Sequence, residues 1–208
     1  MIRLFAALVV LAAVIAATVI TYAVATGLDA RAQPSAIEAR LARGVRSLAI
    51  PRAVRGRTNP VARSADVLAE GMSHYADHCA SCHANNGSGD TEMGRGLFPK
   101  PPDMRQAATQ ELTDGELFYI IENGVKLTGM PAWGNRTREG ETASWHLVQF
   151  IRHMPSMTEA ELAEMEDLNP RGRAEWQALE EERRFLSGEK PSPPTAPASP
   201  HQHKGASQ

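Results

Sequence analysis

The chain has 208 residues, of which 42% are hydrophobic, and this length allows one or two small domains. The net charge of −2 hides an asymmetry: residues 27–63 hold eight arginines against two carboxylates, whereas residues 64–157 hold seven basic and twelve acidic residues. A folded part with an excess of five negative charges would repel phosphates, so the charge pattern excludes nucleic acid as a partner.

The N-terminal run at residues 4–25 contains no charged residue. At 1.5 Å per residue, a helix of about 20 apolar residues crosses a bilayer, so we expect residues 1–26 to be a transmembrane anchor. A secretory signal is the alternative, because Ala23-Val24-Ala25 and Ala30-Arg31-Ala32 both have the pattern of a cleavage site. The length of the run favours the anchor.

Residues 27–63 are predicted to be a basic linker. Within it, apolar and basic residues alternate at helical spacing, which predicts a short amphipathic helix with Ile37, Leu41, Val45, Leu48, Arg40, Arg43 and Arg46. Such a helix can lie on a membrane surface or be a solvated connection, and the pattern favours neither. Pro51, Gly56 and Pro60 should end it before the next domain.

Ser64 is an expected N-cap for the first helix of a domain at residues 64–157. Apolar and small residues then recur at helical spacing: Val67, Leu68, Gly71, Met72 and Tyr75. A glycine in mid-helix costs stability, so Gly71 predicts the close approach of another element.

This helix leads into Cys79-Ala80-Ser81-Cys82-His83, which reads C-x-x-C-H, the attachment signature of c-type haem. Two thiols on one helical turn can each form a thioether to a haem vinyl group. The following histidine then supplies the proximal imidazole ligand to iron. Cys79 and Cys82 are the only cysteines in the chain, so a disulfide framework and a four-cysteine zinc site are both excluded.

The two cysteines have two other interpretations. A thioredoxin-like pair would follow a strand at a helix start, but here a helical pattern leads into the motif. A zinc site would need two histidines as well, and His78 and His83 flank the cysteines too closely to complete a tetrahedron with them easily. We therefore expect one covalent haem c.

Further along, residues 84–111 are rich in Gly, Pro and Asn and predict a loop over one haem face. Thr113 with Glu116 forms a capping box for a helix through Asn123, which Gly124 should end. A last domain helix is expected to begin after Thr142 and to stop before Pro155.

The remainder is predicted to be an acidic helical extension at residues 158–188 and a disordered Pro/Ser/His tail at residues 189–208. Thr158 with Glu161 should cap the first helix of the extension, to about Leu168, and Asn169-Pro170 should start the second, which Gly188 ends. His201 and His203 could bind a metal, although a solvated tail is the simpler interpretation.

Three motifs together resemble a class I cytochrome c. They are the run from Gly71 to His83, the run Asn123–Gly134 with Gly129-Met130-Pro131 at its centre, which looks like that family's distal methionine loop, and Trp145–Ile151, which looks like its closing helix. The resemblance covers about residues 64–157. It implies an all-α fold around one haem.

The resemblance also implies roles for individual residues. Met130 would be the second iron ligand opposite His83, with Met104 as the runner-up. A proline carbonyl would accept the imidazole N–H of His83, and Pro102 is our choice, with Pro99 and Pro101 left open. Trp133 and Arg105 could reach the haem propionates. The other histidines of the domain are expected to be surface residues: His74, His78, His146 and His153.

The side of the membrane follows from the haem motif, because thioether attachment in bacteria occurs outside the cytoplasmic membrane, as the resemblance implies. The positive-inside rule alone would point the other way, since Arg3 precedes the span and the arginines of the linker follow it. We give the motif precedence and expect a single-pass protein of the bacterial cytoplasmic membrane with its haem domain on the periplasmic side.

The expected function is a one-electron carrier in a respiratory or periplasmic chain, without catalytic residues of its own. No Ser-His-Asp set or phosphate-binding loop is present. A cytochrome subunit of a membrane-associated oxidoreductase and a haem sensor with an open iron site are the alternatives. Redox proteins are the expected partners, although the sequence names neither the donor nor the acceptor.

Overall fold

A computed structural model describes residues 2–27, 29–171 and 173–188. Within these residues the chain forms helices and no strand, which confirms the prediction of an all-α fold. The chain divides into two compact units between Asn169 and Pro170.

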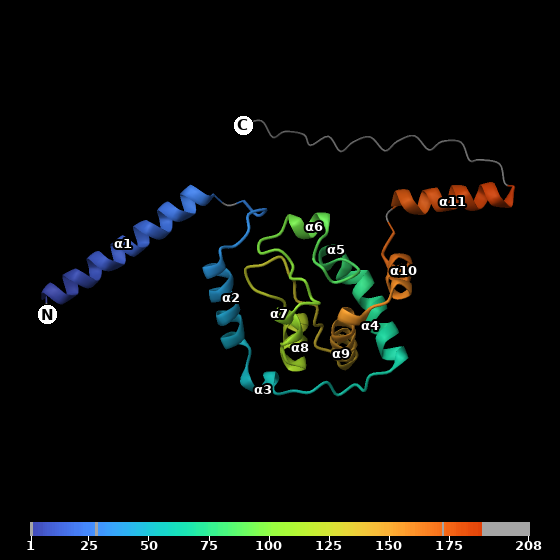
Figure 1. The fold of residues 1–208 in the computed structure, drawn as a ribbon, viewed down its shortest axis with the longest axis horizontal. Coiled ribbons are helices and arrows are strands. Elements are labelled where there is room, and N and C mark those ends of the chain that lie inside the picture. Colours follow the sequence, from blue (N-terminus) through green and yellow to red (C-terminus); the bar gives the residue numbers. More distant parts are fainter. Residues whose placement is uncertain (1, 28, 172, 189–208) are drawn as a thin grey trace. The chain divides into compact units, whose positions relative to one another are not determined.

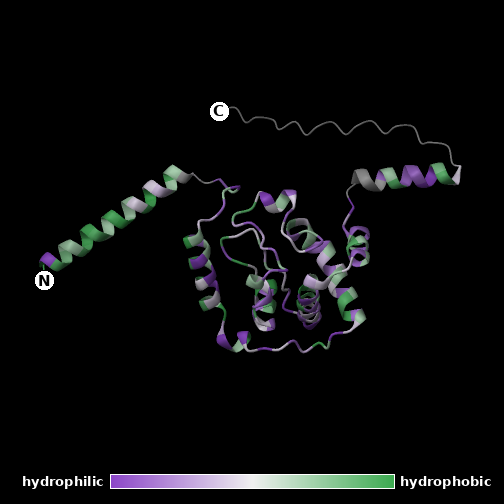
Figure 2. Cartoon of the chain, in the orientation of Figure 1, coloured by the Kyte–Doolittle hydropathy of each residue, from purple (hydrophilic) through white to green (hydrophobic). Residues whose placement is uncertain are grey.

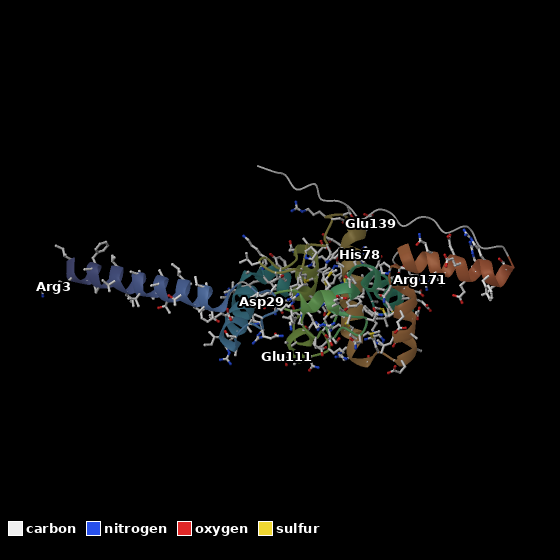
Figure 3. All side chains as sticks on the ribbon, turned by 90° about the horizontal axis from the view of Figure 1, so that it is seen from above. Arg3, Asp29, His78, Glu111, Glu139 and Arg171 are labelled. Carbon is white, nitrogen blue, oxygen red and sulfur yellow. The ribbon has the colours of Figure 1, made fainter. Side chains whose placement is uncertain are left out.

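Helix α1 (Ile2–Thr26) is predominantly hydrophobic, as Figure 2 shows. Its one charged residue is Arg3, near its beginning, which Figure 3 labels. Residues Ile2–Ala25 are long and apolar enough to cross a membrane, and their side chains are not buried inside the protein. A helix of this kind fits membrane anchoring.

The basic linker contains two helices, α2 (Ala36–Ala49) and α3 (Arg52–Arg55), on either side of Pro51. The predicted amphipathic helix is confirmed as α2, and Ser35 with Glu38 forms a capping box at its start. Its four predicted apolar residues are all strongly exposed: Ile37, Leu41, Val45 and Leu48.

The linker is fastened to the following domain from Ile50 onward. Ile50 is buried, and the Arg55 guanidinium pairs with Glu116 on α8 (Asp114–Asn123) at 3.2 Å. The Thr113 hydroxyl donates a hydrogen bond to the Arg55 carbonyl oxygen at 2.8 Å. Gly115 on α8 also touches the Val54 carbonyl oxygen, so a side chain there would collide with the linker. The packed part of the chain therefore begins before residue 64.

The core lies between α4 (Ala65–His78), α8 and α9 (Arg138–His153), and α4 packs along α9 (Figure 1). Ser64 caps α4 as predicted, and its side chain accepts the Val67 N–H. Tyr75 and Phe150 meet across the two helices with ring centroids 5.3 Å apart. Trp145 stacks on Phe118, with ring centroids 4.2 Å apart.

The prediction that Thr142 caps the closing helix is wrong. The N-cap of α9 is Thr137, whose hydroxyl accepts the Gly140 N–H at 3.0 Å. Thr142 lies inside the helix, where its hydroxyl donates to the Arg138 carbonyl oxygen. The end of the helix is as predicted, because α9 stops at His153 and residues Met154–Ser156 form a single 3-10 turn.

Two short helices interrupt the predicted loop region, α6 (Glu92–Arg95) and α7 (Ala107–Gln110). A third short helix, α5 (Ala80–His83), precedes the loop and carries the cysteine motif. The capping box of Thr113 and Glu116 is present at the start of α8, and Gly124 ends that helix with a φ of +64°. The remaining backbone of residues 84–111 is irregular and held by local hydrogen bonds.

The acidic extension is divided between the two compact units. Helix α10 (Glu159–Leu168) has the predicted capping box of Thr158 and Glu161, and it packs on α4 with the Met165 side chain fully buried. The second helix does not begin at Asn169 as predicted. Asn169 ends α10, and α11 spans Arg173–Ser187 before Gly188. The predicted tail at 189–208, with His201 and His203, lies outside the described residues.

Candidate haem site

The two cysteines and His83 lie on one tight turn directly after α4. Cys79 ends α4 and begins α5, and its carbonyl oxygen accepts both the Cys82 N–H at 3.1 Å and the His83 N–H at 2.9 Å. Side chains three positions apart on a helical turn lie on the same face, so both thiols can reach one flat ligand. Neither cysteine is in a disulfide.

The segment that follows the turn holds it in place. The Gly89 N–H donates to the His83 carbonyl oxygen at 2.8 Å, and the Thr91 hydroxyl donates to that of Cys82 at 3.3 Å. Gly94 packs so closely that a Cβ there would lie 2.7 Å from the Cys82 oxygen. The main chain around the motif is therefore fixed by three contacts that involve no cysteine or histidine side chain.

Tyr75 fastens the other side of the same turn. Its hydroxyl donates to the carbonyl oxygen of Ala84 at 3.0 Å, and Ala84 itself has a φ of +63°, which is unusual for a residue with a side chain. Burial raises the pKa of Tyr75 well above its usual value. The hydroxyl therefore stays protonated and able to donate.

Cys79, Cys82 and His83 open onto a single cavity. The space between its walls amounts to about 1180 Å³, including solvent at its mouth. Most of the walls are apolar side chains from α8, α9 and the loops before and after α8: Leu97, Leu112, Leu117, Ile120, Ile121, Val125, Leu147 and Ile151. An apolar cavity of this kind suits a large, flat, mostly apolar ligand.

His83 has the state that a metal ligand needs. Burial lowers its pKa to about 4, so the imidazole is neutral at pH 7 and keeps a lone pair for a cation. Its Nδ1 atom is buried and has no hydrogen-bond partner among the described residues. A buried polar atom without a hydrogen-bond partner is costly. In a metal-binding histidine, one ring nitrogen binds the metal and the other is hydrogen-bonded, so the unpaired Nδ1 indicates a site that takes a further group.

Cys79 is in an environment that disfavours a charged sulfur. Burial, and secondarily the neighbouring Cys82, raise the pKa of Cys79 to about 12. A thiolate would be unstable here, whereas an uncharged thioether suits the surroundings. The described residues also bring together no group of three His, Cys, Asp or Glu side chains that could hold a metal, and a helix rather than a strand precedes the cysteines. The donor set fits haem c better than zinc or a redox-active dithiol.

Met104 and Met130, the two candidates for the second ligand, both line the cavity, but they lie on different loops. The Met104 N–H donates to the Gly87 carbonyl oxygen at 2.8 Å, which ties Met104 to the segment just after His83, and its side chain is only 8% exposed. Met130 is half-buried on the loop after α8. That loop is held by its own bonds, from Val125 N–H to the Met130 oxygen and from Met130 N–H to the Thr128 hydroxyl.

Trp133 and Pro102 also line the cavity. The Trp133 ring is 39% exposed and stacks on the imidazole of His78, with centroids 5.0 Å apart and planes 7° apart. His78, labelled in Figure 3, is therefore part of the rim rather than an isolated surface residue. Pro102 is exposed, and the structure shows no hydrogen bond between its carbonyl oxygen and His83. Its predicted role stays a prediction.

The structure changes the assignment of cations near the cavity. Arg105 does not line it, because its guanidinium makes two hydrogen bonds to the Asp103 carboxylate at 2.9 and 2.8 Å. Arg46 of the linker and Lys100 line it instead, and our sequence analysis missed both for this role. A helical projection of α2 would have separated Arg46 from the apolar stripe, although not shown what it faces.

Residues 66–151 match the family model described as cytochrome c oxidase, cbb3-type, subunit III. The match takes in the cysteine motif, both candidate methionines and most of α9, and it covers less than half of the chain. Helices α1, α2, α3, α10 and α11 lie outside it.

Proposed function

Residues 66–151 are a c-type cytochrome domain, as the three sequence motifs predicted, and on that premise we propose that this chain is a membrane-anchored mono-haem electron carrier. The observation that carries the proposal is the placement of Cys79, Cys82 and His83 on one turn at the edge of an apolar cavity. Haem bound there would supply a one-electron iron couple. The surrounding residues would hold the haem and bind its iron.

On one side, Cys79 and Cys82 would hold the haem through thioethers, and His83 would be the proximal ligand. The hydrogen bonds of Gly89 and Thr91 to the turn keep the three side chains in register. A ligand on such a fixed turn changes position little when the charge of its metal changes, which favours fast electron transfer over substrate binding.

On the other side, Met130 would be the second ligand. Its loop returns to α8 through hydrogen bonds from the Trp133 and Gly134 N–H groups to the carbonyl oxygens of Ile121 and Glu122. The Met104 backbone is bonded to Gly87 in the segment just after His83, which would itself bind the iron, whereas Met130 comes from the loop after α8. This separation supports Met130 over Met104. If His83 and Met130 both bound the iron, the protein would leave it no position for a substrate.

A finer proposal concerns the assembly. The matched family describes a subunit of cbb3-type oxidases, and α1 is long enough to hold the chain in a membrane. We therefore propose that the chain is the cytochrome subunit of a membrane-associated oxidoreductase, in the bacterial cytoplasmic membrane with the haem domain on the periplasmic side. Its redox partners would then be other subunits of that complex.

The test is spectroscopic and uses the full chain in detergent. Covalent haem that survives acid–acetone extraction, one haem per chain, and a reduced spectrum unchanged by carbon monoxide at neutral pH are the expected results. Ready binding of carbon monoxide would favour the haem sensor with an open iron site. Absence of covalent haem would refute the proposal.

Co-purification from solubilised membranes tests the proposal that the chain is an oxidoreductase subunit. A chain that purifies alone counts against that proposal.

A further inference from the structure

The linker helix α2 contributes a side chain to a cavity that is otherwise built by the cytochrome domain. Among the residues that line the cavity, Arg46 is the only one from before residue 66, where the family match begins. The next lining residue along the chain is Tyr75, which lies on α4. The haem site therefore reaches beyond the domain that defines the family.

Arg46 is held at this place by the rest of the linker. The Arg55 guanidinium donates to the carbonyl oxygens of Ser47 and Ile50, so it covers the C-terminal end of α2. Arg55 in turn pairs with Glu116 on α8, and Ile50 is buried. The end of α2 that carries Arg46 is thus bound to the domain through the Arg55–Glu116 ion pair and the buried Ile50.

The guanidinium of Arg46 is half-buried and forms no hydrogen bond or ion pair with any described residue. Burial lowers its pKa, and the like charge of Arg43 acts in the same direction. The nearest carboxylate that acts on it, Glu116, is already bonded to Arg55 and to the Thr113 N–H. A half-buried cation without a protein partner is free to pair with an anion bound in the cavity.

The cavity supplies the setting for that anion. Its lining includes two fixed cations, Arg46 and Lys100, and no Asp or Glu side chain. The part of haem that is neither apolar nor metal is a pair of propionate carboxylates. We propose, as an extension of the proposed haem site, that Arg46 pairs with a haem propionate and that α2 closes this edge of the site.

Arg46 and the exposed apolar stripe of α2 would then lie on different sides of the helix. At 100° per residue, Arg46 lies roughly 140° around the helix from the centre of the stripe formed by Ile37, Leu41, Val45 and Leu48. Arg43 is exposed and does not line the cavity. The two arginines lie one turn apart on the same helix and differ in whether they line the cavity, so Arg43 is a matched control for Arg46.

The experiment compares Arg46→Gln with Arg43→Gln in the full chain. Both should retain covalent haem. A cation beside the haem favours the reduced, less positive iron, so Arg46→Gln should shift the reduction potential to a lower value, clearly more than Arg43→Gln does. The Arg46→Lys variant should restore part of the shift. Resonance Raman bands of the propionates should change in Arg46→Gln alone.

Limited proteolysis gives a second measurement that does not depend on the potential. Without the propionate pair, α2 should open more often, and trypsin should cut the linker of Arg46→Gln faster than that of Arg43→Gln. Equal potentials, equal Raman spectra and equal cleavage in the two variants would overturn the proposal while leaving the haem protein intact. A wild-type chain without covalent haem would overturn the proposed function and this inference together.

Discussion

Gly71 on α4 lies directly against the backbone of His146 on α9: a Cβ built on this glycine would come within 2.5 Å of the His146 carbonyl oxygen and 2.9 Å of the Phe150 Cβ. The crossing of the two longest helices of the cytochrome domain depends on this absent side chain. The mid-helix glycine predicted such a contact, and the structure identifies its partner.

Gly71→Ala should destabilise the domain by about 1–3 kcal/mol, because the helices must move apart. The gain in helix propensity, about 1 kcal/mol, is too small to offset this. Thermal unfolding of the haem-loaded protein should show the loss as a fall of several degrees. Gly44→Ala in α2 is the matched control, since nothing lies within 4 Å of its Cβ position. Equal melting temperatures for the two variants would contradict the close contact.

Cys79→Ala combined with Cys82→Ala should abolish covalent haem and most of the folded domain. The core is small, and the cofactor would fill the cavity at its centre. Haem staining after denaturing electrophoresis and circular dichroism measure the two losses. Ser81→Ala, an exposed change inside the same turn, should leave both signals intact. Recovery of a haem-free domain of normal thermal stability would contradict the expected dependence on haem.

Met130→Ala should lower the reduction potential by roughly 100 mV or more, a modest part of the ~0.8 V that axial ligands span. A thioether stabilises ferrous iron, so its loss favours the ferric state. The iron should also become open to carbon monoxide, and the far-red sulfur-to-iron band should disappear. Met104→Leu, which keeps the core volume, should change neither property. The reverse pattern would make Met104 the ligand.

Glu161→Gln tests the joint between α9 and α10. The Thr158 backbone N–H, and after it the hydrogen bond with His153 at 2.6 Å, hold the pKa of Glu161 below its usual 4.5. A depressed carboxyl pKa contributes stability above pH 4.5, which is lost as the pH falls through the lowered value. The variant should therefore be less stable at pH 7 by about 1 kcal/mol or less.

The same difference should shrink below pH 4.5, where wild-type Glu161 also becomes neutral. Chemical denaturation of both proteins between pH 7 and pH 3 measures it. Glu164→Gln removes one charge from an exposed position of the same helix and should show no such pH dependence. A difference that stays constant over this range would mean that the carboxylate charge is unimportant at the joint.

Helix α1 should remain in the mature protein as its anchor. Intact mass spectrometry of protein purified from membranes should give a chain that still contains residues 4–25, and alkaline carbonate should fail to extract it. A mature N-terminus at Thr26 or Gln33 would instead identify the run as a cleaved signal, consistent with the two small-x-small patterns.

Local features of this chain were predictable because they depend on neighbours in sequence. The capping boxes at Thr113 and Thr158 follow from hydroxyl and carboxylate groups three residues apart, and both are present. The cap of α9 was predicted at Thr142, and Thr137 was not considered. Both precede helical residues, and only the extended backbone at Thr137 decides which hydroxyl faces free N–H groups.

The parts of the site that were missed depend on contacts between distant residues. Arg46 reaches the cavity only because Arg55 and Ile50 bind the linker to α8, and no local pattern encodes that arrangement. Arg105 was expected either near the propionates or as a solvent-facing charge. Its Nε and Nη2 groups donate to the carboxylate of Asp103 instead, which lowers the pKa of Asp103 to about 2.

The attachment of α2 to the domain also limits how far an electron can be carried. Only residues 27–35 separate the end of α1 from the start of α2, and nine residues at full stretch cover about 30 Å. With α1 in the bilayer, a domain bound to α2 cannot travel into bulk solution to meet a diffusing acceptor. Such a domain would swing only on a short tether, so any partner would have to present its electron-accepting surface within that reach of the membrane.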